Sequence, residues 1–427
     1  MEQQHGPASL RVGIFFDGTG NNQANAQAAQ GGEGGSYANA LSNIALLHAL
    51  YPGGQVDDEF FLKCYVQGIG TCEGAPDSAF GGATGRGHAG VQARVEQALA
   101  AVAQQVHDCL ASHRQVLPGK ITFDLFGFSR GAAAARHLAN RLAEAAEGLP
   151  GELQCHRVIE FIGLFDTVAA IVAPLRGNFD PATDDYDGLQ LGLGQGIARQ
   201  VVQLVAGDER RRNFPLLRCG NDIVVPGVHS NIGGGYPATL REQVLLCKPQ
   251  SNRVPAATPA EHTRAYAAVQ ALLASAIVQL GDPQPCLQVW EEPVSEGRGK
   301  REDPEKQVYV AVYREREVSG HLSRIYLSIM RELAVSNGVP FAGLGGDEAH
   351  RLPEELQAIS EKLHDYALGR CQGPQLTPAE QALLQRKYVH TSAHWNALAG
   401  LRNSSLDVLY INRPEEGGRV MHDNPLG

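Results

Sequence analysis

The stretch 120–140, KITFDLFGFSRGAAAARHLAN, constrains the fold more than any other part of the sequence. Its first half contains a short apolar, partly aromatic run at 121–126 that is typical of a buried strand. Residues 131–146 are rich in Ala, Leu, Arg and Glu, which are strong helix formers. We therefore predict a strand that passes through a sharp turn directly into a helix, with Ser129 at the turn.

The turn itself, residues 127–131, reads G-F-S-R-G and so has the G-x-S-x-G pattern of a serine nucleophile held between a strand and a helix. A nucleophile on such a tight turn needs neighbours without a Cβ, so that the two elements can approach each other. The free N–H groups at the start of the helix would also favour a developing oxyanion. We predict Ser129 as the nucleophile and the Arg130 N–H as an oxyanion donor. The alternative is an ordinary Gly-Ser turn in a chain with 49 glycines.

Composition excludes several classes of function. The 427-residue chain has a formal net charge of −10, which provides no basic field for nucleic acid or anionic headgroups. It has no run of 18 apolar residues, and its beginning lacks a charged region followed by an apolar one. We therefore expect a protein without a signal peptide that is made and is soluble in the cytoplasm. The eight scattered cysteines form no C-x-x-C pair and have no metal-ligand spacing, so they are expected to be small core residues in a reducing compartment. No metal or cofactor is expected, and calcium dependence stays open.

A second candidate site element follows the strand expected at 10–16, which opens into the loop D-G-T-G-N-N. In one interpretation this loop donates the second oxyanion N–H from Gly18 or its neighbours, while Asp17 fixes the loop by hydrogen bonds. A second interpretation is a phosphatase of the haloacid dehalogenase type. It is disfavoured because Phe15 occupies the place of the attacking carboxylate. The third is an Asx turn without a catalytic role.

Two further strands end in residues that can complete a catalytic triad. The apolar run 158–165 leads to Asp166, and the run 222–228 leads to His229 and a glycine cluster. The order Ser129, Asp166, His229 is the order of nucleophile, acid and base in α/β-hydrolases. We predict that His229 is the general base and that Asp166 orients it.

Alternatives remain for both residues. Asp166 can instead be a helix N-cap or a turn anchor. His390 is a rival base because it comes late enough in the chain, with His394 one helical turn later. The H-x-x-x-H spacing of this pair, without an adjacent Glu, is a poor metal site.

The sequence predicts a single domain, 1–427, with two additions. Residues 170–215 are expected to be a cap insertion whose second part, 197–214, is helical, and the charges at 209–212 are expected to form a solvated face. Residues 258–405 are expected to be a mostly helical C-terminal insertion or extension. Smaller elements are also expected, namely a mobile loop at 23–36, helices at 258–281 and 321–338, a loop at 282–305, and strands at 308–316 and 406–414.

Seven blocks in one order give the chain a family resemblance: RVGIFFDGTGNN, QGIGT, LFGFSRGAAAAR, GLFDTV, DERRRNF, VPGVHSNIGGGY and KYVHTSA. Together they resemble the bacterial α/β-hydrolase-like domain of type VI secretion lipase effectors of the first family. The resemblance implies an α/β-hydrolase-like fold, with a mostly parallel central sheet, helices on both faces and helical cap insertions. By motif, it assigns the triad to Ser129, Asp166 and His229.

The resemblance also implies a function. It implies a phospholipase A-type antibacterial effector that hydrolyses glycerophospholipid acyl esters. Its partners would be the phospholipid membrane of a target cell, the components of the type VI spike and a cognate immunity protein. Delivery would be into the periplasm of the target cell. Members of this family are often longer and carry a C-terminal membrane-binding region that this chain is expected to lack. Two other hypotheses remain: a soluble carboxylesterase or depolymerase, and a non-catalytic binding module that has kept the fold.

Overall fold

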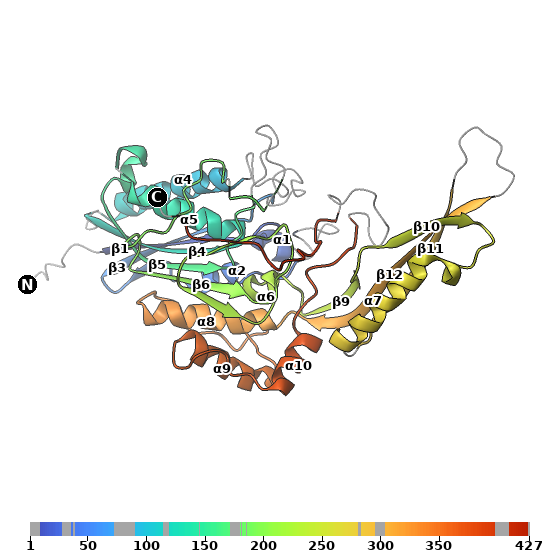
Figure 1. The fold of residues 1–427 in the computed structure, drawn as a ribbon. Coiled ribbons are helices and arrows are strands. Elements are labelled where there is room, and N and C mark those ends of the chain that lie inside the picture. The colour runs from blue at the N-terminus through green and yellow to red at the C-terminus, as the bar shows by residue number, and fades with distance from the viewer. Residues whose placement is uncertain are drawn as a thin grey trace, which may run out of the picture.

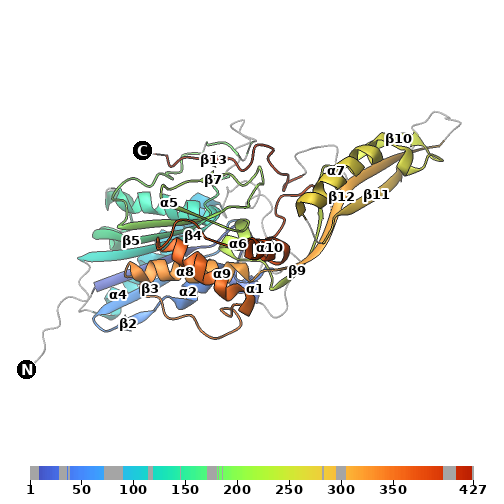
Figure 2. The same cartoon turned by 60° about the horizontal axis from the view of Figure 1, so that its bottom comes forward.

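The structure is a computed structural model of the chain, shown in Figure 1 and Figure 2. It describes residues 9–27, 36, 39–71, 90–113, 119–144, 146–170, 180, 182–184, 186–280, 283–294, 304–397 and 410–425. Most of the loop expected at 23–36 lies outside the described residues, but 23–27 form a short helix. Of the strand expected at 406–414, residues 406–409 lie outside the described residues. Residues 410–414 form no strand apart from an isolated bridge between Pro414 and Arg211, so that prediction is wrong for the described part.

A seven-stranded sheet forms the centre of the molecule, in the order β2-β3-β1-β4-β5-β6-β8. All neighbouring strands pair in parallel except β2 and β3. The strands are β1 (Ser9–Phe16), β2 (Gly54–Val56), β3 (Glu59–Val66), β4 (Lys120–Phe128), β5 (His156–Phe165), β6 (Gln200–Ala206) and β8 (Asp222–Val225). This is a mixed α/β fold with a mostly parallel sheet, as expected from the sequence.

Helices cover both faces of the sheet (Figure 1). One face packs against α4 (Val91–Ser112) and α5 (Arg130–Ala143), and the other against α2 (Asn43–Leu50) and α8 (Leu322–Ser336), with α9 (Gln357–Ala367) and α10 (Pro378–Lys387) beyond α8. Side chains alternate between these two cores along each strand. In β1, Phe16 packs with the α4–α5 core and Phe15 with the α2–α8 core, where Phe15 stacks on Phe126 of β4 with ring centroids 5.2 Å apart. Both faces of the central strands are therefore apolar.

The connections of the sheet change direction between β1 and β4. After β1 the chain adds β3 on one side, and after β4 it adds β5 on the other side. Ligands of open α/β sheets bind outside the carboxyl ends of the strands at such a switch point. Phe16 at the end of β1 pairs in register with Gly127 near the end of β4. The loop after β1 and the turn after β4 are therefore neighbours.

An arm projects from the body beyond β9 (Figures 1 and 2). Its four antiparallel strands are β9 (Thr239–Leu245), β10 (Gln250–Pro255), β11 (Cys286–Pro293) and β12 (Glu305–Ser319), and α7 (Arg264–Leu280) packs on them. Val269 of α7 and Val308 and Val310 of β12 form a small separate core. At the base of the arm, Arg316 forms a buried ion pair with Glu242, with 2.8 Å between Nε and Oε2.

The remaining described elements are short. They are α1 (Gln23–Gln27), α6 (His229–Gly233), β7 (Leu216–Leu217) and β13 (Met421–His422), and the 3₁₀ turns Ala146–Gly148, Gly151–Leu153, Ala260–His262 and Glu354–Leu356. None of the helices in the described ranges combines the length and the apolar character needed to cross a bilayer.

Two predictions about the additions are wrong in part. The helix predicted at 197–214 is instead β6, a strand of the central sheet, so 170–215 is not one cap insertion, and residues 171–179 lie outside the described part. Its valine-rich run QVVQLVA suits a strand buried on both faces. The loop predicted at 282–305 contains β11, so 258–405 includes an antiparallel sheet besides its helices. The helices predicted at 258–281 and 321–338 are confirmed as α7 and α8.

Candidate active site

Ser129 occupies a strained turn between β4 and α5, with φ 59° and ψ −127°. L-residues with a side chain rarely adopt this conformation, and such strain is concentrated at functional sites. The flanking glycines allow the turn to form. A Cβ on Gly127 would lie 2.5 Å from the carbonyl oxygen of Gly131. A Cβ on Gly131 would lie closer than 3.0 Å to the carbonyl oxygens of Phe16 and Asp17.

Backbone hydrogen bonds fix Ser129 at the carboxyl edge of the sheet. Its N–H donates to the carbonyl of Phe165 (3.0 Å), and its carbonyl accepts from the N–H groups of Ala132 (3.0 Å) and Val168 (3.3 Å). The side chain of Ser129 makes no hydrogen bond within the described residues, and the residue is 4% exposed. The position of Ser129 is therefore fixed by its backbone hydrogen bonds and not by a hydrogen bond of its side chain.

Asp166 and His229 come together beside this turn. Asp166 follows β5, His229 begins α6 after β8, and Nδ1 of His229 lies 2.5 Å from Oδ2 of Asp166. An ionised carboxylate only accepts hydrogen bonds, so Nδ1 carries the proton and Nε2 is available to accept one. The imidazole also packs on the rings of Phe128 (4.6 Å between centroids) and Phe214 (5.0 Å). Phe128 is the residue before Ser129, so the two halves of the predicted triad adjoin.

The described residues show no hydrogen bond between His229 and Ser129. Catalytic hydrogen bonds are often long in free enzymes and shorten when substrate binds. The structure therefore brings Asp166 and His229 into direct contact, and it brings Ser129 to the same sheet edge.

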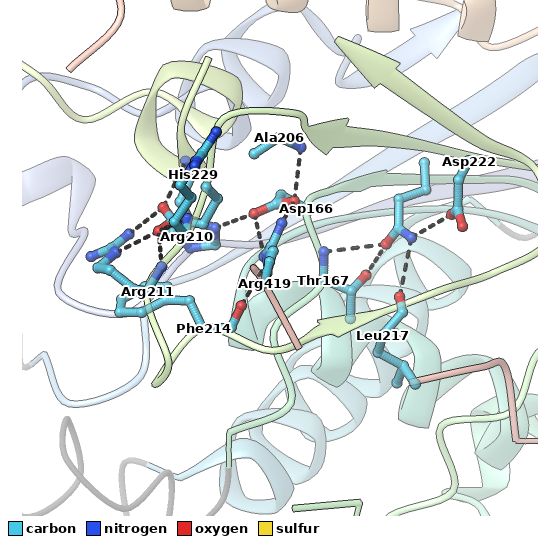
Figure 3. A network of polar contacts seen from close by, with 12 residues as sticks. Asp166, Thr167, Ala206, Arg210, Arg211, Phe214, Leu217, Asp222, His229 and Arg419 are labelled. Atoms are coloured by element: carbon cyan, nitrogen blue, oxygen red, sulfur yellow. Dashed lines mark hydrogen bonds and ion pairs between the residues drawn. The ribbon is translucent and has the colours of Figure 1, made fainter. Parts of the chain in front are cut away.

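Asp166 is fully buried and has a second side-chain partner, the charged guanidinium of Arg419 (Figure 3). Nη1 of Arg419 lies 2.7 Å from Oδ1 and Nη2 lies 2.8 Å from Oδ2, while the N–H of Ala206 donates to Oδ1 (3.0 Å). Burial alone would raise the pKa of Asp166, but the charge of Arg419 and the hydrogen bond from His229 hold this pKa well below its usual range. Burial lowers the pKa of His229, although Asp166 opposes this effect, which favours the neutral imidazole of a general base.

A second buried acid, Glu209, supports the backbone of His229. Its Oε2 accepts from the His229 N–H (3.2 Å) and lies 2.9 Å from Nη2 of Arg211, whose guanidinium lies 3.3 Å from the ring centroid of Phe214. Burial would raise the pKa of Glu209, but Arg211 brings it down to about 2. Glu209 is only 3% exposed, so the prediction of a solvated face at 209–212 is wrong for these two residues. A charge run can be buried when its members pair with each other.

The loop after β1 is fixed by Asp17. Its carboxylate accepts from the N–H of Gly18, the hydroxyl of Ser42 and the hydroxyl of Tyr65, each at 2.7 Å. Burial raises the pKa of Asp17 to about 6. Because the Gly18 N–H already donates to Asp17, the N–H of the next residue, Thr19, is the better candidate donor to a ligand. It has no acceptor among the described residues.

Arg130 connects this loop to the turn at Ser129, since its Nε donates to Oγ1 of Thr19 (2.8 Å). The ring of Phe15 lies in the α2–α8 core and presents no group to the site. The phosphatase interpretation therefore gains nothing from the structure.

His390 lies near α6 but outside the Asp166–His229 pair. Its Nδ1 lies 3.0 Å from Nδ2 of Asn231, and its ring stacks on Tyr236 with 3.7 Å between centroids. Its Nε2 is buried and has no hydrogen-bond partner among the described residues, and burial lowers the pKa of His390 to about 4. No described contact joins it to Ser129 or Asp166. Within the described ranges, no group of three or more His, Cys, Asp or Glu side chains is arranged to hold a metal ion.

Arg419 and Glu209 were not predicted as site residues from the sequence, and Thr19 was included only as a neighbour of Gly18. The block DERRRNF contains Glu209 and could have indicated it, because that block already contributed to the family resemblance. Thr19 follows Gly18, the residue named first as the source of the second oxyanion N–H. Arg419 follows a polar stretch without a motif, 253 residues from Asp166, and no sequence signal marks it.

Comparison with known proteins confirms the family resemblance. Residues 11–149 match the family model described as "T6SS, Phospholipase effector Tle1-like, catalytic domain", a range that includes Ser129 and ends before Asp166 and His229. The chain is similar over 98% of its length, at 26% identity and a TM-score of 0.77, to a solved Tle1 effector bound to the VgrG spike of the type 6 secretion system, and it covers 94% of that effector.

A weaker likeness links the chain to an uncharacterised protein from Pseudomonas aeruginosa, at 20% identity and a TM-score of 0.45. It covers 88% of this chain and 52% of that one. No curated protein matches the sequence.

Proposed function

We propose that this chain is a lipolytic antibacterial effector, a serine hydrolase that cleaves acyl esters of glycerophospholipids. The match to the Tle1-like catalytic domain and the likeness to a whole Tle1 effector support a phospholipase effector. One observation carries the serine mechanism. Ser129, in its strained turn after β4, lies at the same sheet edge as the hydrogen-bonded pair of Asp166 and His229.

The strand topology supports the finer assignment to an α/β-hydrolase-like fold. The candidate nucleophile follows β4, the acid follows β5 and the histidine follows β8, in the chain order Ser, Asp, His. All three strands run in parallel, so their carboxyl ends lie along one edge of the sheet.

The proposed reaction follows from the positions of these groups. His229 Nε2 takes the proton of Ser129 as Oγ attacks the ester carbonyl, while Asp166 holds the imidazole in the tautomer with a proton on Nδ1. The N–H groups of Arg130 and Thr19 stabilise the oxyanion of the tetrahedral intermediate. The intermediate expels the lysophospholipid alcohol, which receives its proton from His229. Water then attacks the acyl-enzyme ester while His229 takes its proton. The second tetrahedral intermediate releases the fatty acid, and His229 returns the proton to Oγ of Ser129.

Delivery and partners follow from the same likeness. The similar Tle1 effector is bound to a VgrG spike, and we assign this chain a spike component as its carrier. Its substrate would then be the phospholipid membrane reached from the periplasm of a target cell, and the producing cell would need a cognate immunity protein. The phospholipase A-type specificity and the absence of a cofactor belong to the same proposal.

Acyl release from mixed phospholipid vesicles tests the function. Wild type should release fatty acid, and Ser129→Ala should lose at least about 10⁴-fold of this activity while remaining folded. Ser328→Ala is a matched control, because Ser328 lies on α8 and its hydroxyl contacts His364, 3.0 Å away. Lipids labelled separately at the two acyl positions identify the bond that is cleaved, and assays with and without a calcium chelator settle the role of calcium.

Two other outcomes identify the alternatives. Hydrolysis of short soluble esters without release from vesicles would replace the phospholipase with a soluble esterase. No turnover of either substrate by folded wild type would favour a non-catalytic binding module. Activity retained by Ser129→Ala would contradict the serine mechanism itself.

A further inference from the structure

Residues 410–425 form a segment that crosses the carboxyl edge of the sheet and contacts several separate parts of the body. Its strand β13 pairs in parallel with β7, and the N–H of Leu216 donates to the carbonyl of Val420 (2.9 Å). Closer to the start of the segment, the N–H of Glu415 donates to the carbonyl of Arg210 (2.8 Å). The segment is therefore bound to the loops that follow β6, next to Glu209 and His229.

Near its end the segment also contacts the helix that begins at the candidate nucleophile. Nη2 of Arg136, in the middle of α5, donates to Oδ1 of Asn424 (2.6 Å), and Nδ2 of Asn424 donates to the carbonyl of Leu193 (2.9 Å). Arg136 is fully buried. The segment thus has polar contacts with α5 on one side of Arg419 and with the Glu209 loop on the other.

Arg419 lies between these anchors and points into the site (Figure 3). Two of its nitrogens reach the two oxygens of Asp166, and its Nε donates to the carbonyl of Phe214 (2.7 Å). Its side chain is only 7% exposed. A planar guanidinium that engages both oxygens of a carboxylate fixes the plane of the carboxylate as well as its position.

This arrangement matters because each carboxylate oxygen has two hydrogen-bond partners. Oδ2 of Asp166 accepts from both Arg419 and His229, while Oδ1 accepts from Arg419 and the N–H of Ala206. With these four bonds, the carboxylate has one orientation that satisfies every donor. Without Arg419, Asp166 would be a buried anion whose remaining hydrogen-bond donors, the neutral His229 and the Ala206 N–H, carry no charge, which is a costly state for a carboxylate.

We propose that Arg419 is a positioning residue of the active site, whose guanidinium orients the Asp166 carboxylate toward Nδ1 of His229. The segment 410–425 thereby completes the triad from a distant part of the chain. This inference rests on the proposed function, since it assigns Arg419 a part in the chemistry of Ser129.

The groups that face the pair determine the expected pH effect. Asp166 and the cations Arg419 and Arg211 face His229, and Glu209 accepts from its backbone. Arg419 lowers the pKa of both Asp166 and His229. Because the reaction needs an ionised Asp166 and a neutral His229, loss of Arg419 should move the acid limb of the rate profile to higher pH.

Labelling of Ser129 by a fluorophosphonate tests the inference without any lipid. In this reaction Oγ bonds to phosphorus, fluoride leaves, and the hydroxyl proton passes to His229. Rates are compared between pH 5 and 9 for wild type, Arg419→Gln, Arg419→Lys and Asp166→Asn. Arg419→Gln should be labelled at least about tenfold more slowly near neutral pH, with the acid limb shifted upward. Arg419→Lys should lie between Arg419→Gln and wild type, and added guanidinium ion should restore part of the rate of Arg419→Gln.

Arg212→Gln is the matched control. Arg212 pairs with Glu415 of the same segment (2.7 Å) but does not contact Asp166. This variant removes the pair with Glu415 and a second pair with Asp180 (2.8 Å) but leaves Arg419 and Asp166 in contact, so it should keep the wild-type profile. Thermal unfolding confirms that each variant is folded.

The outcomes separate the two proposals. Folded wild type that is not labelled would overturn the proposed function and this inference with it. Labelled wild type together with an Arg419→Gln variant of unchanged rate and profile would overturn this inference alone. A rate loss that is equal at all pH values, is matched by Arg212→Gln and is not rescued by guanidinium would also overturn it, because it would show a purely structural role.

Discussion

Gly131 lies directly against the backbone carbonyl of Asp17, so that a Cβ on residue 131 would be closer than 3.0 Å to that oxygen. This contact joins the first turn of α5 to the end of β1. The two segments that carry the candidate oxyanion donors, Arg130 and Thr19, therefore lie at a distance set by backbone packing. The second glycine of the G-x-S-x-G pattern fixes the spacing of the site as well as permitting the turn.

Replacing this glycine should damage both stability and activity. Gly131→Ala would force the backbone of α5 away from β1, because the groups it meets are carbonyl oxygens and cannot rotate aside. We expect a loss of about 1–3 kcal/mol in the free energy of unfolding and a larger fractional loss of fluorophosphonate labelling. Urea unfolding and labelling rates measure the two effects. Gly151→Ala is the control, since a Cβ there meets nothing within 4 Å and both quantities should stay at wild-type values.

The choice of general base can be tested by comparing two histidines. His229→Ala should reduce acyl release by at least about 10⁴-fold, because it removes the proposed proton acceptor of Ser129. His390→Ala should retain most of the activity, because His390 contacts Asn231 and Tyr236 instead. Vesicle assays on both variants, with thermal unfolding as the check on folding, give the comparison. The reverse pattern would make His390 the base and leave the Asp166–His229 pair without the role assigned here.

Asp17 should contribute a pH dependence to stability. Its folded-state pKa is raised from 3.8 to about 6 by burial, so the folded state binds a proton more tightly than the unfolded state does. The contribution of Asp17 to the free energy of unfolding is therefore greatest below about pH 4, and it is lost as the pH rises through about 6. A pKa raised from 3.8 to about 6 corresponds to a full effect of ~3 kcal/mol in the free energy of unfolding.

Urea unfolding of wild type and Asp17→Asn at pH 4 and pH 7 measures this effect. The stability of wild type relative to the variant should be about 2 kcal/mol greater at pH 4 than at pH 7, because lost hydrogen bonds cancel in the comparison. The exposed Asp58→Asn controls for removal of a carboxylate from the same part of the chain. A difference of the opposite sign would show that Asp17 is stabilised as an anion in the folded protein.

The base of the arm should depend on one buried ion pair. Glu242→Gln would leave the guanidinium of Arg316 buried without an anion, which costs about 3–5 kcal/mol in the free energy of unfolding. The carbonyl of Val389 and the hydroxyl of Thr391 would remain as its partners. Glu315→Gln, which breaks an exposed pair with Arg241 on the same sheet, is the control and should leave the melting temperature unchanged. Equal melting temperatures for both variants would contradict a structural role for the Glu242–Arg316 pair.

The elements that were predictable from sequence are those whose signal is local. The turn at Ser129 needs a strand, two glycines and a helix within 20 residues, and all of them are visible in the sequence. The start of α10 is similar, because Thr377 and Glu380 form a capping box that can be read from four residues. Placing Asp166 and His229 together required only that the ends of parallel strands meet at one edge.

The features that were missed depend on partners distant in the chain. The run 197–206 has no strict alternation, and it becomes β6 because the sheet buries both of its faces. The residues of β11 are intermediate or exposed and include two glutamates, so their sequence does not indicate a buried strand. They form a strand because β12 pairs with them. Glu209 and Arg211 appeared solvated because charge runs usually are, yet each neutralises the other beneath Phe214. Tertiary pairing decided each case.

The contact between Arg419 and Asp166 also bears on how the protein folds. It closes a loop of 253 residues, so it can form only after the sheet and the elements inserted between them have been organised. The sheet can form before Arg419 reaches Asp166, whereas Asp166 acquires all of its hydrogen bonds only when Arg419 is in place. Recovery of nucleophilic reactivity after dilution from denaturant should therefore lag behind recovery of secondary structure. In this protein, a reactive serine would be a late marker of folding.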